Sequence, residues 1–276
     1  MKEQFILEAI DITFEYSDGT KALNEVNMSI EEGKKIAVLG PNGAGKTTLF
    51  LHFNGILKPK SGKILYKGEE INYRHSELVK LRKNVGIVFQ NPDIQLFSAS
   101  VYQEISFGPM NLGYPENIVK EKVENAMKET RIIGLKDKPT HFLSYGQKKS
   151  VSIADIIVME PEVIILDEPT VYLDPKHVQE IMGLFGKLVE KGKTIILSTH
   201  DVDFAYSWAD YIYVMKNGKV VAKGEPTVVF ANAKELDRSD LKKPMLLEIY
   251  EILKEKGIIS GSNIPKNIEE LKKYIK

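Results

Sequence analysis

Eight consecutive residues near the start of the chain have the types and spacing that bind a phosphate group. They are Gly40, Pro41, Asn42, Gly43, Ala44, Gly45, Lys46 and Thr47, which match G-x-x-x-x-G-K-[ST]. Glycines let such a loop wrap so that successive N–H groups point inward, while the lysine reaches the terminal phosphates and the Thr47 hydroxyl suits Mg²⁺. We expect a nucleoside triphosphate here. The alternative, a glycine-rich turn without function, is disfavoured by the apolar strand before the loop and the helical stretch after it.

Two adjacent carboxylates, Asp167 and Glu168, follow the apolar run 163–166. Asp167 suits a Mg²⁺ shell, directly or through water, because magnesium prefers hard oxygen ligands and keeps several waters. The side chain of Glu168, the next residue, is expected to point in a different direction from that of Asp167. Glu168 is the candidate general base for an attacking water. Alone, such a pair reads equally well as a helix-capping turn. Together with the phosphate loop, it predicts a hydrolytic site.

A histidine, His200, follows another apolar run, 194–197. It would lie at the carboxyl end of a neighbouring strand, where open α/β sheets bind ligands, and could hydrogen-bond the terminal phosphate. For a lone residue, a satisfied surface histidine would be the ordinary interpretation.

Short apolar runs that predict buried parallel strands must position these residues. They lie at 36–39, 85–89, 163–166 and 194–198. Helical stretches at 116–132 and 175–190 alternate with them, the second preceded by Asp174 and Pro175 as a cap and first-turn pair. This alternation predicts an α/β layer fold.

Three further segments complete the expected organisation. Residues 5–16 alternate as a strand, expected at an antiparallel edge, and break at a turn near Gly19. Residues 211–222 predict a hairpin, because Asn217-Gly218 supplies the positive φ angles of a type I′ turn. From about residue 232 the chain is rich in Lys and Glu with helical spacing, which predicts a small carboxyl-terminal helical appendage.

Composition excludes several classes of protein. The chain has 276 residues, with 38 basic and 38 acidic side chains that cancel, so nothing supports a general attraction to nucleic acid or anionic lipid. With no cysteine, disulfide frameworks and thiolate chemistry are excluded. No window approaches 18 consecutive apolar residues, so no membrane span is expected.

These elements, joined by Leu143-Ser144-Tyr145-Gly146-Gln147, resemble the ATP-binding cassette (ABC) ATPase family over about residues 5–230. The resemblance implies a P-loop NTPase fold with a RecA-like mixed sheet core, an antiparallel β subdomain and a helical subdomain at about 91–158. It places the nucleotide-binding domain at 1–230 and the extension at 231–276. It also implies ATP and Mg²⁺ as cofactors.

In that family the signature segment, here Ser144, Tyr145, Gly146 and Gln147, caps the terminal phosphate bound to a second copy's P-loop. The resemblance therefore implies a head-to-tail dimer with itself or a paralogue. The resemblance also implies adenine stacking by Tyr16, phosphate-loop contacts extending to Thr48 and a dimer contact at Asp174. Gln90 is carried over as a catalytic residue that links Mg²⁺ to the transport subunit. For Tyr16 and Gln90, an ordinary core or surface position is the alternative.

Within the family, residues 91–98 followed by Phe107-Gly108-Pro109 resemble the energy-coupling factor (ECF) importers of transition-metal ions and vitamins. Tyr145 resembles their cobalt and nickel branch. The resemblance implies a membrane coupling subunit and a membrane substrate-binding subunit as partners, at the cytoplasmic face of the membrane. The apolar residues after Gln90 would suit a coupling helix, or would form the core of the helical subdomain.

Some positions depart from the family pattern. Ser150 stands where arginine is usual, Asp155 where a small residue is usual, and Val171-Tyr172 where the dimer loop carries small residues. The departures bear on the symmetry and rate of a dimer, since the phosphate-facing positions are intact.

Two other functions compete with transport. Soluble ABC proteins of DNA repair or translation carry long coiled-coil insertions or two cassettes, and the interval from Gln90 to Ser144 leaves no room for such an insertion. A P-loop kinase for a small molecule would give no reason for the signature segment or for His200.

Overall fold

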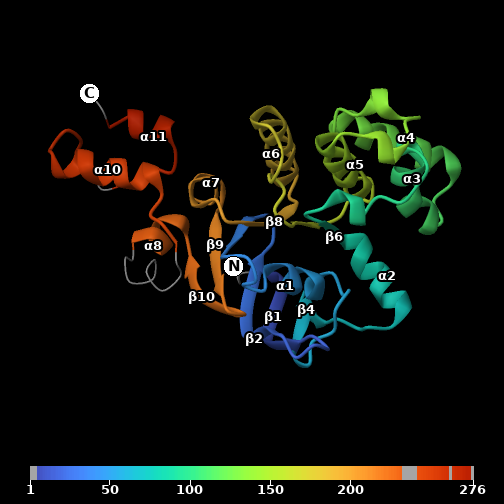
Figure 1. Cartoon of the computed structure of the whole chain (residues 1–276), viewed down its shortest axis with the longest axis horizontal. Helices are drawn as coiled ribbons and strands as arrows, with labels where there is room; N and C mark the ends of the chain where they lie inside the picture. Colours follow the sequence, from blue (N-terminus) through green and yellow to red (C-terminus); the bar gives the residue numbers. More distant parts are fainter. Residues whose placement is uncertain (1–4, 232–240, 261–262, 275–276) are drawn as a thin grey trace.

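The computed structural model describes residues 5–231, 241–260 and 263–274 (Figure 1). One of its two sheets is antiparallel, with strand order β2-β1-β4-β5. Its strands are β1 (Phe5–Glu15), β2 (Lys21–Glu31), β4 (Ser61–Tyr66) and β5 (Glu69–Glu70). The expectation that residues 5–16 form an edge strand is wrong. β1 pairs with β2 on one side and β4 on the other, because strands that come later in the chain cover both of its sides.

The second sheet has six strands in the order β10-β9-β3-β8-β7-β6. They are β3 (Lys35–Leu39), β6 (Val85–Val88), β7 (Val163–Leu166), β8 (Thr194–Thr199), β9 (Tyr211–Lys216) and β10 (Lys219–Gly224). All four predicted apolar runs belong to this sheet and pair in parallel with their neighbours. Among the strands described in this sheet, only β10 is antiparallel, joined to β9 through Asn217 (φ 50°) and Gly218 (φ 72°), as the hairpin prediction requires.

Helices cover both faces of the six-stranded sheet. The described helices, some of which lie beyond the ends of the sheet, are α1 (Lys46–Phe53), α2 (His75–Asn84), α3 (Val101–Asn111), α4 (Glu116–Glu129), α5 (Tyr145–Ile157), α6 (Pro175–Glu190), α7 (Val202–Trp208), α8 (Pro226–Ala231), α10 (Met245–Glu255) and α11 (Ile268–Lys272). Short 3₁₀ turns occupy η1 (Pro92–Ile94), η2 (Ile133–Leu135) and η3 (Thr140–Phe142). The predicted bounds of α6 are confirmed, whereas α4 ends three residues early, and Arg131 just beyond it has a positive φ of 59°.

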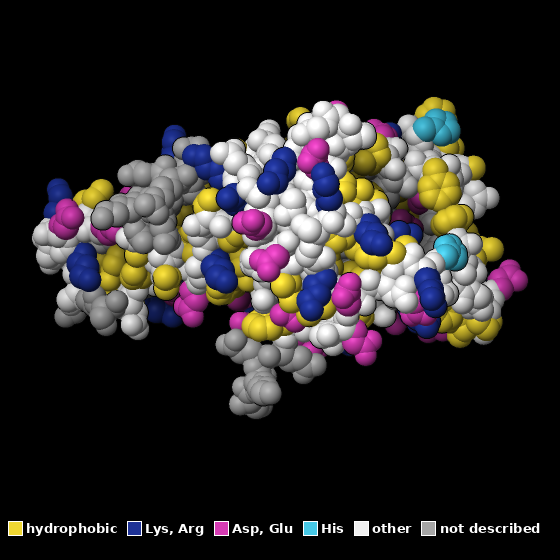
Figure 2. Space-filling view, turned by 90° about the horizontal axis from the view of Figure 1, so that it is seen from below, with side chains coloured by type: hydrophobic (Ala, Val, Ile, Leu, Met, Phe, Trp, Pro, Cys, Tyr) yellow, Lys and Arg dark blue, Asp and Glu magenta, His cyan; other side chains and the backbone are white. Residues whose placement is uncertain are grey.

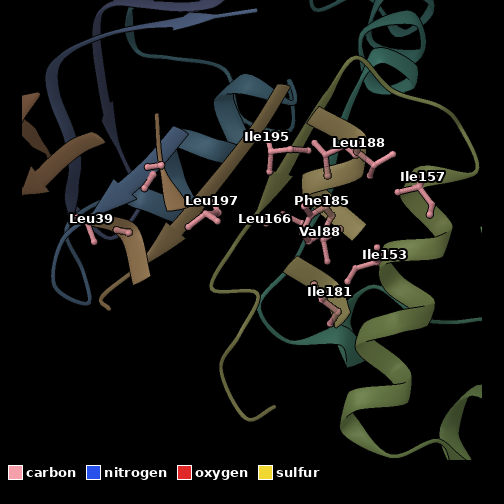
Figure 3. Close-up of a cluster of buried hydrophobic side chains, with 14 of the residues drawn as sticks. Leu39, Val88, Ile153, Ile157, Leu166, Ile181, Phe185, Leu188, Ile195 and Leu197 are labelled. Carbon is pink, nitrogen blue, oxygen red and sulfur yellow. The ribbon is translucent and has the colours of Figure 1, made fainter. Parts of the chain in front are cut away.

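Two apolar cores lie on opposite faces of the six-stranded sheet, because alternate residues of each strand point to opposite sides. In β3, Ile36 and Val38 join the core shared with α1 and the antiparallel sheet, while Ala37 and Leu39 join the core shared with α5 and α6. Figure 3 shows Phe185 and Ile181 of α6 meeting Leu166 of the sheet and Ile153 of α5. Burying each such side chain contributes about 1.5–3 kcal/mol.

The helical subdomain and the carboxyl-terminal helices lie at opposite ends of the molecule. Helices α3–α5 lie beyond β6, and α10 and α11 lie beyond α7 and α8 (Figure 1). The extension is attached through polar bonds: the buried Tyr206 hydroxyl donates to the Pro265 carbonyl (2.9 Å) and the Met245 N–H to Asp203 Oδ1 (2.6 Å). Leu247 joins the α5–α6 core.

Part of the predicted appendage, residues 232–240, lies outside the described residues. Among the helices of the described ranges, none combines the length and apolar character needed to cross a bilayer.

Candidate functional site

The phosphate loop lies between β3 and α1, and its glycines adopt backbone conformations that other residues rarely reach. Gly45 caps α1 with φ 100°, and a Cβ at this position would come within 2.5 Å of the Ala22 carbonyl oxygen. The hairpin turn between β9 and β10 braces the loop from outside: the Gly218 N–H donates to the Ala44 carbonyl (3.1 Å), and the Asn24 N–H of β2 donates to the Gly218 carbonyl (2.8 Å). Two distant segments thus fix the shape of the loop.

Lys46 is buried at the start of α1. Its ammonium donates to the carbonyls of Gly40 (2.6 Å) and Pro41 (3.1 Å) and lies 3.7 Å from Glu168 Oε1. The loop therefore directs its one ammonium toward the carboxylates that follow β7.

Hard oxygen ligands meet at Asp167. The Thr47 hydroxyl donates to Asp167 Oδ2 (2.6 Å) and the Ser198 hydroxyl to Oδ1 (2.6 Å). Gln90 lines the same cavity. Hydroxyl, carboxylate and amide oxygens at this spacing fit the donor preference of Mg²⁺. Sequence reasoning gave Ser198 no role; the available signal was its place at the end of the apolar run in β8, next to β7.

Glu168 occupies a strained position just after β7, with φ 44°. Its N–H donates to the Ser198 hydroxyl (2.8 Å), and its Oε2 lies 3.2 Å from His200 Nδ1. Its Oε1 is buried and, within the described part of the chain, has no hydrogen-bond partner. Such strain persists where the surroundings over-determine it, as at functional sites. A carboxylate oxygen that accepts no hydrogen bond, on a residue that lines the cavity, suits the role of accepting a proton from water.

The cavity around these groups has a volume of about 370 Å³. It is lined by Tyr16, Thr20, Lys21, Ala22, residues 42–48, Gln90, Asp167 and Glu168. Tyr16 is partly exposed at this cavity, its hydroxyl 3.0 Å from Thr48 Oγ1 and its ring packed edge-on against Phe14. His200 is exposed and reaches the site only through Glu168. Four separate segments thus form the lining. Of the predicted phosphate-loop residues, Gly40 and Pro41 do not line it, although their carbonyls accept from Lys46.

The signature segment lies apart from this cavity, since none of residues 144–147 is among the described residues that line it. Ser144 caps α5, and Gln147 completes a capping box by accepting from the Ser144 N–H (3.1 Å). The Tyr145 hydroxyl donates to the Gln90 carbonyl (2.9 Å). Contact between this segment and the nucleotide of another chain stays a prediction.

Asp174 and the residues that depart from the family pattern lie in or next to α5 and α6. Asp174 caps α6 and accepts from the His177 N–H (3.0 Å), which lowers the pKa of its carboxyl. Tyr172 is 81 % exposed with φ 62° and packs edge-on against Tyr145. Ser150 is buried in α5.

Asp155 takes part in a partly buried polar cluster beside the segment that follows Gln90. Its Oδ2 accepts from Gln95 Nε2 (3.2 Å), and Gln95 Nε2 also donates to the Ser152 carbonyl (2.9 Å). Burial raises the pKa of Asp155 to about 7, and the charge of Glu104 adds to the rise. The departure at this position thus joins α5 to the segment after Gln90.

Comparison with known proteins agrees with this geometry. The family model described as ABC transporter matches residues 23–171. The chain is 49 % identical to the energy-coupling factor transporter ATP-binding protein EcfA3 of Clostridium perfringens. The match covers 99 % of this chain and 96 % of that protein. It is 48 % identical to the corresponding EcfA of Methanocaldococcus jannaschii, over 92 % of this chain and 91 % of the relative.

Solved structures give the same result. The structure of cbiO1 from Clostridium perfringens, part of the ABC transporter complex cbiONQ, superposes on this chain with a TM-score of 0.76 at 50 % identity. The match covers 93 % of this chain and 100 % of that one. A dimeric bacterial ABC transporter cassette gives a TM-score of 0.73 at 28 % identity, covering 80 % and 98 %.

The fold and the site together define an ATP-binding cassette, and the chain belongs to the ABC transporter family. Within that family it is an ATP-binding protein of the energy-coupling factor type, an ATPase coupled to transport. The resemblance stated from the sequence is confirmed, as is the predicted fold class.

Proposed function

We propose that this chain is the ATP-hydrolysing subunit of an importer and works as one half of a pair of cassettes, with itself or a paralogue. One observation carries the proposal: the P-loop and both carboxylates share a cavity that the chain's own signature segment does not line. A second cassette placed head-to-tail would supply that segment. The helix start at Ser144 offers it N–H groups and a positive dipole end, both suited to a terminal phosphate.

The charged and polar residues in and beside the cavity have distinct tasks in this proposal. Lys46 and the loop N–H groups hold the phosphates, and Glu168 Oε1 accepts a proton from the attacking water. His200 Nδ1, 3.2 Å from Glu168 Oε2, orients that carboxylate and approaches the terminal phosphate. Thr47, Asp167 and Gln90 would hold Mg²⁺, which when bound neutralises phosphate charge.

An exposed apolar patch supports a membrane partner. Ile94, Phe97, Phe107 and Met110, here called the apolar patch, are each about half or more exposed, and Phe97 and Phe107 pack edge-on at 4.8 Å. Apolar side chains grouped on a surface mark interaction sites. We assign the patch to a coupling helix of an integral membrane subunit, so that the chain acts at the cytoplasmic face of the membrane.

The imported solute would be bound by a separate membrane subunit. We propose a cobalt ion, another transition-metal ion or a vitamin. Support comes from Tyr145, which resembles the cobalt and nickel branch, and from the similarity to cbiO1 of the complex cbiONQ. The soluble alternative finds no support in the surface charge: on the face shown in Figure 2, Lys and Arg are interspersed with Asp and Glu and form no basic stripe.

The test is to purify the tagged chain from membranes of its native cell, identify its partners and measure the metals and vitamins they retain. Membrane vesicles containing the complex should then take up the retained solute when supplied with ATP. The same vesicles carrying Glu168→Gln should not. Recovery of the chain without any integral membrane protein would contradict the transport function and favour a soluble one.

A further inference from the structure

Two side chains of α5 converge on one backbone atom of the segment that carries Gln90. The Tyr145 hydroxyl and the Lys149 ammonium each donate to the Gln90 carbonyl at 2.9 Å. Lys149 also donates to the Phe89 carbonyl at 2.8 Å. Because Tyr145 and Lys149 are four residues apart, they lie one turn apart on the same helix face.

Lys149 is an unusual residue to find in this position, because its side chain is fully buried. A buried ammonium costs free energy unless hydrogen bonds satisfy it, so an apolar side chain would fill the space with less penalty. Its hydrogen bonds in the structure all go to the backbone at Phe89 and Gln90. The position of this backbone is therefore what the lysine specifies.

In the proposed pair of cassettes, the two ends of this contact belong to different nucleotide sites. Tyr145 is the first residue of α5, and the capping box between Ser144 and Gln147 makes the first turn of that helix rigid. Gln90, at the other end, lines the cavity that contains Lys46 and Thr47. Two hydrogen bonds thus connect the first two turns of α5 to Gln90.

We propose that Tyr145 and Lys149 are positioning residues that tie Gln90 to α5. Through them, contact between the signature segment and a second cassette's nucleotide sets the position of Gln90 in the chain's own site. The inference rests on the proposed function, in which the signature segment acts on a second cassette. The inference names the atoms that would connect the two nucleotide sites within one chain: the Tyr145 hydroxyl, the Lys149 ammonium and the Gln90 carbonyl oxygen.

Other contacts hold the segment after Gln90 against α5, so removing Lys149 need not unfold it. Gln95 Nε2 donates to the Ser152 carbonyl at 2.9 Å, and Lys148 Nζ lies 2.6 Å from Asp93 Oδ1. Substitution at Lys149 therefore tests the position of Gln90 and leaves the attachment of the whole segment in place.

The experiment compares Lys149→Met, Lys149→Arg and Tyr145→Phe in the full chain. Lys128→Met, an exposed lysine on α4, is the matched control. Three quantities are measured: amide hydrogen exchange of residues 89–96 without nucleotide, the Kd for ATP, and kcat for hydrolysis. Thermal unfolding of each variant identifies any general loss of stability.

Lys149→Met should raise exchange in residues 89–96 about tenfold, as expected for the loss of charge-assisted hydrogen bonds. It should lower kcat about tenfold and leave the Kd for ATP within about twofold. Lys149→Arg keeps the hydrogen-bond donors and the charge, so its exchange at residues 89–96 and its kcat should be close to those of wild type. Tyr145→Phe should change exchange and kcat in the same directions as Lys149→Met, but less. The control should match wild type.

Unchanged exchange at 89–96 in Lys149→Met would overturn the inference, and so would a fall in ATP affinity that parallels the fall in kcat. If Lys149→Met does not fold, the same two outcomes are judged on Tyr145→Phe, which removes one hydroxyl from a partly exposed ring. If wild type hydrolyses no ATP, the proposed function fails, while exchange at 89–96 still decides whether the link exists.

Discussion

The Lys46 ammonium and the Glu168 carboxylate form a buried ion pair in the wall of the nucleotide cavity, with Nζ 3.7 Å from Oε1 and both side chains only 7 % exposed. The lysine is also bonded to two carbonyls of its own loop. A terminal phosphate that binds Lys46 must take the ammonium from these partners, and in doing so it comes beside Glu168. One contact thus positions both the proposed phosphate-binding residue and the proposed base.

Replacement of Lys46 by alanine should weaken ATP binding by about 10- to 100-fold, because a charge-assisted hydrogen bond contributes about 1.5–3 kcal/mol. Isothermal titration calorimetry with Mg-ATP measures the effect. Lys34→Ala, at an exposed lysine near Glu31, is the control and should bind ATP as wild type does. Wild-type affinity in Lys46→Ala would show that the loop does not hold the phosphates.

Glu168→Gln should bind ATP normally, accumulate as a dimer and hydrolyse about 10² to 10⁴ times more slowly, since a general base contributes about that factor. Glutamine keeps the size of the side chain and the backbone bond to Ser198. Sedimentation with Mg-ATP measures dimers, and phosphate release measures turnover. Unchanged turnover would remove Glu168 from the role of base.

Gly218→Ala should lower ATP affinity several-fold and reduce thermal stability more than Gly68→Ala does. Both glycines have a left-handed φ, +72° and +80°, so both variants pay a similar backbone cost. A Cβ at Gly218 would come within 2.7 Å of the Ala22 carbonyl oxygen, whereas one at Gly68 would meet nothing within 4 Å. Because Ala22 lines the nucleotide cavity, the clash should reach the P-loop. Equal effects of the two variants would refute this bracing.

Asp155→Asn should stabilise the chain at pH 8 and leave it almost unchanged near pH 4. Burial raises the pKa of Asp155 to about 7 in the folded chain, so between about pH 4 and 7 the folded state binds more protons than the unfolded state. Stability contributed by this carboxyl therefore falls as the pH rises through that range, by up to about 4 kcal/mol.

Urea unfolding of wild type and Asp155→Asn at several pH values tests the sign. The difference between the two should grow from pH 4 to 7 and then level off. A difference that does not vary with pH would show that Asp155 ionises in the folded chain as it does in the unfolded one.

The sequence predicted the parts of this site that depend on local pattern. The loop 40–47, the carboxylates after the run 163–166 and the turn at Asn217-Gly218 each follow from a few adjacent residues. The contribution of Ser198 and the bonds from Tyr145 and Lys149 to Gln90 depend on which strands and helices become neighbours. The interior position of β1 was not predicted because it also depends on which strands become neighbours: β4, which pairs with β1, comes almost fifty residues later in the chain.

The bond from Tyr206 to Pro265 bears on how this protein can be trimmed. A chain shortened to end at Phe230 would retain Tyr206 in α7 but lose the carbonyl that accepts from its hydroxyl. It would also uncover the apolar surface that Leu247 and Tyr250 shield. Shortened versions of the chain for crystallisation or binding assays are therefore better ended beyond Lys272, since ending earlier would expose apolar surface and an unpaired hydroxyl beside α7.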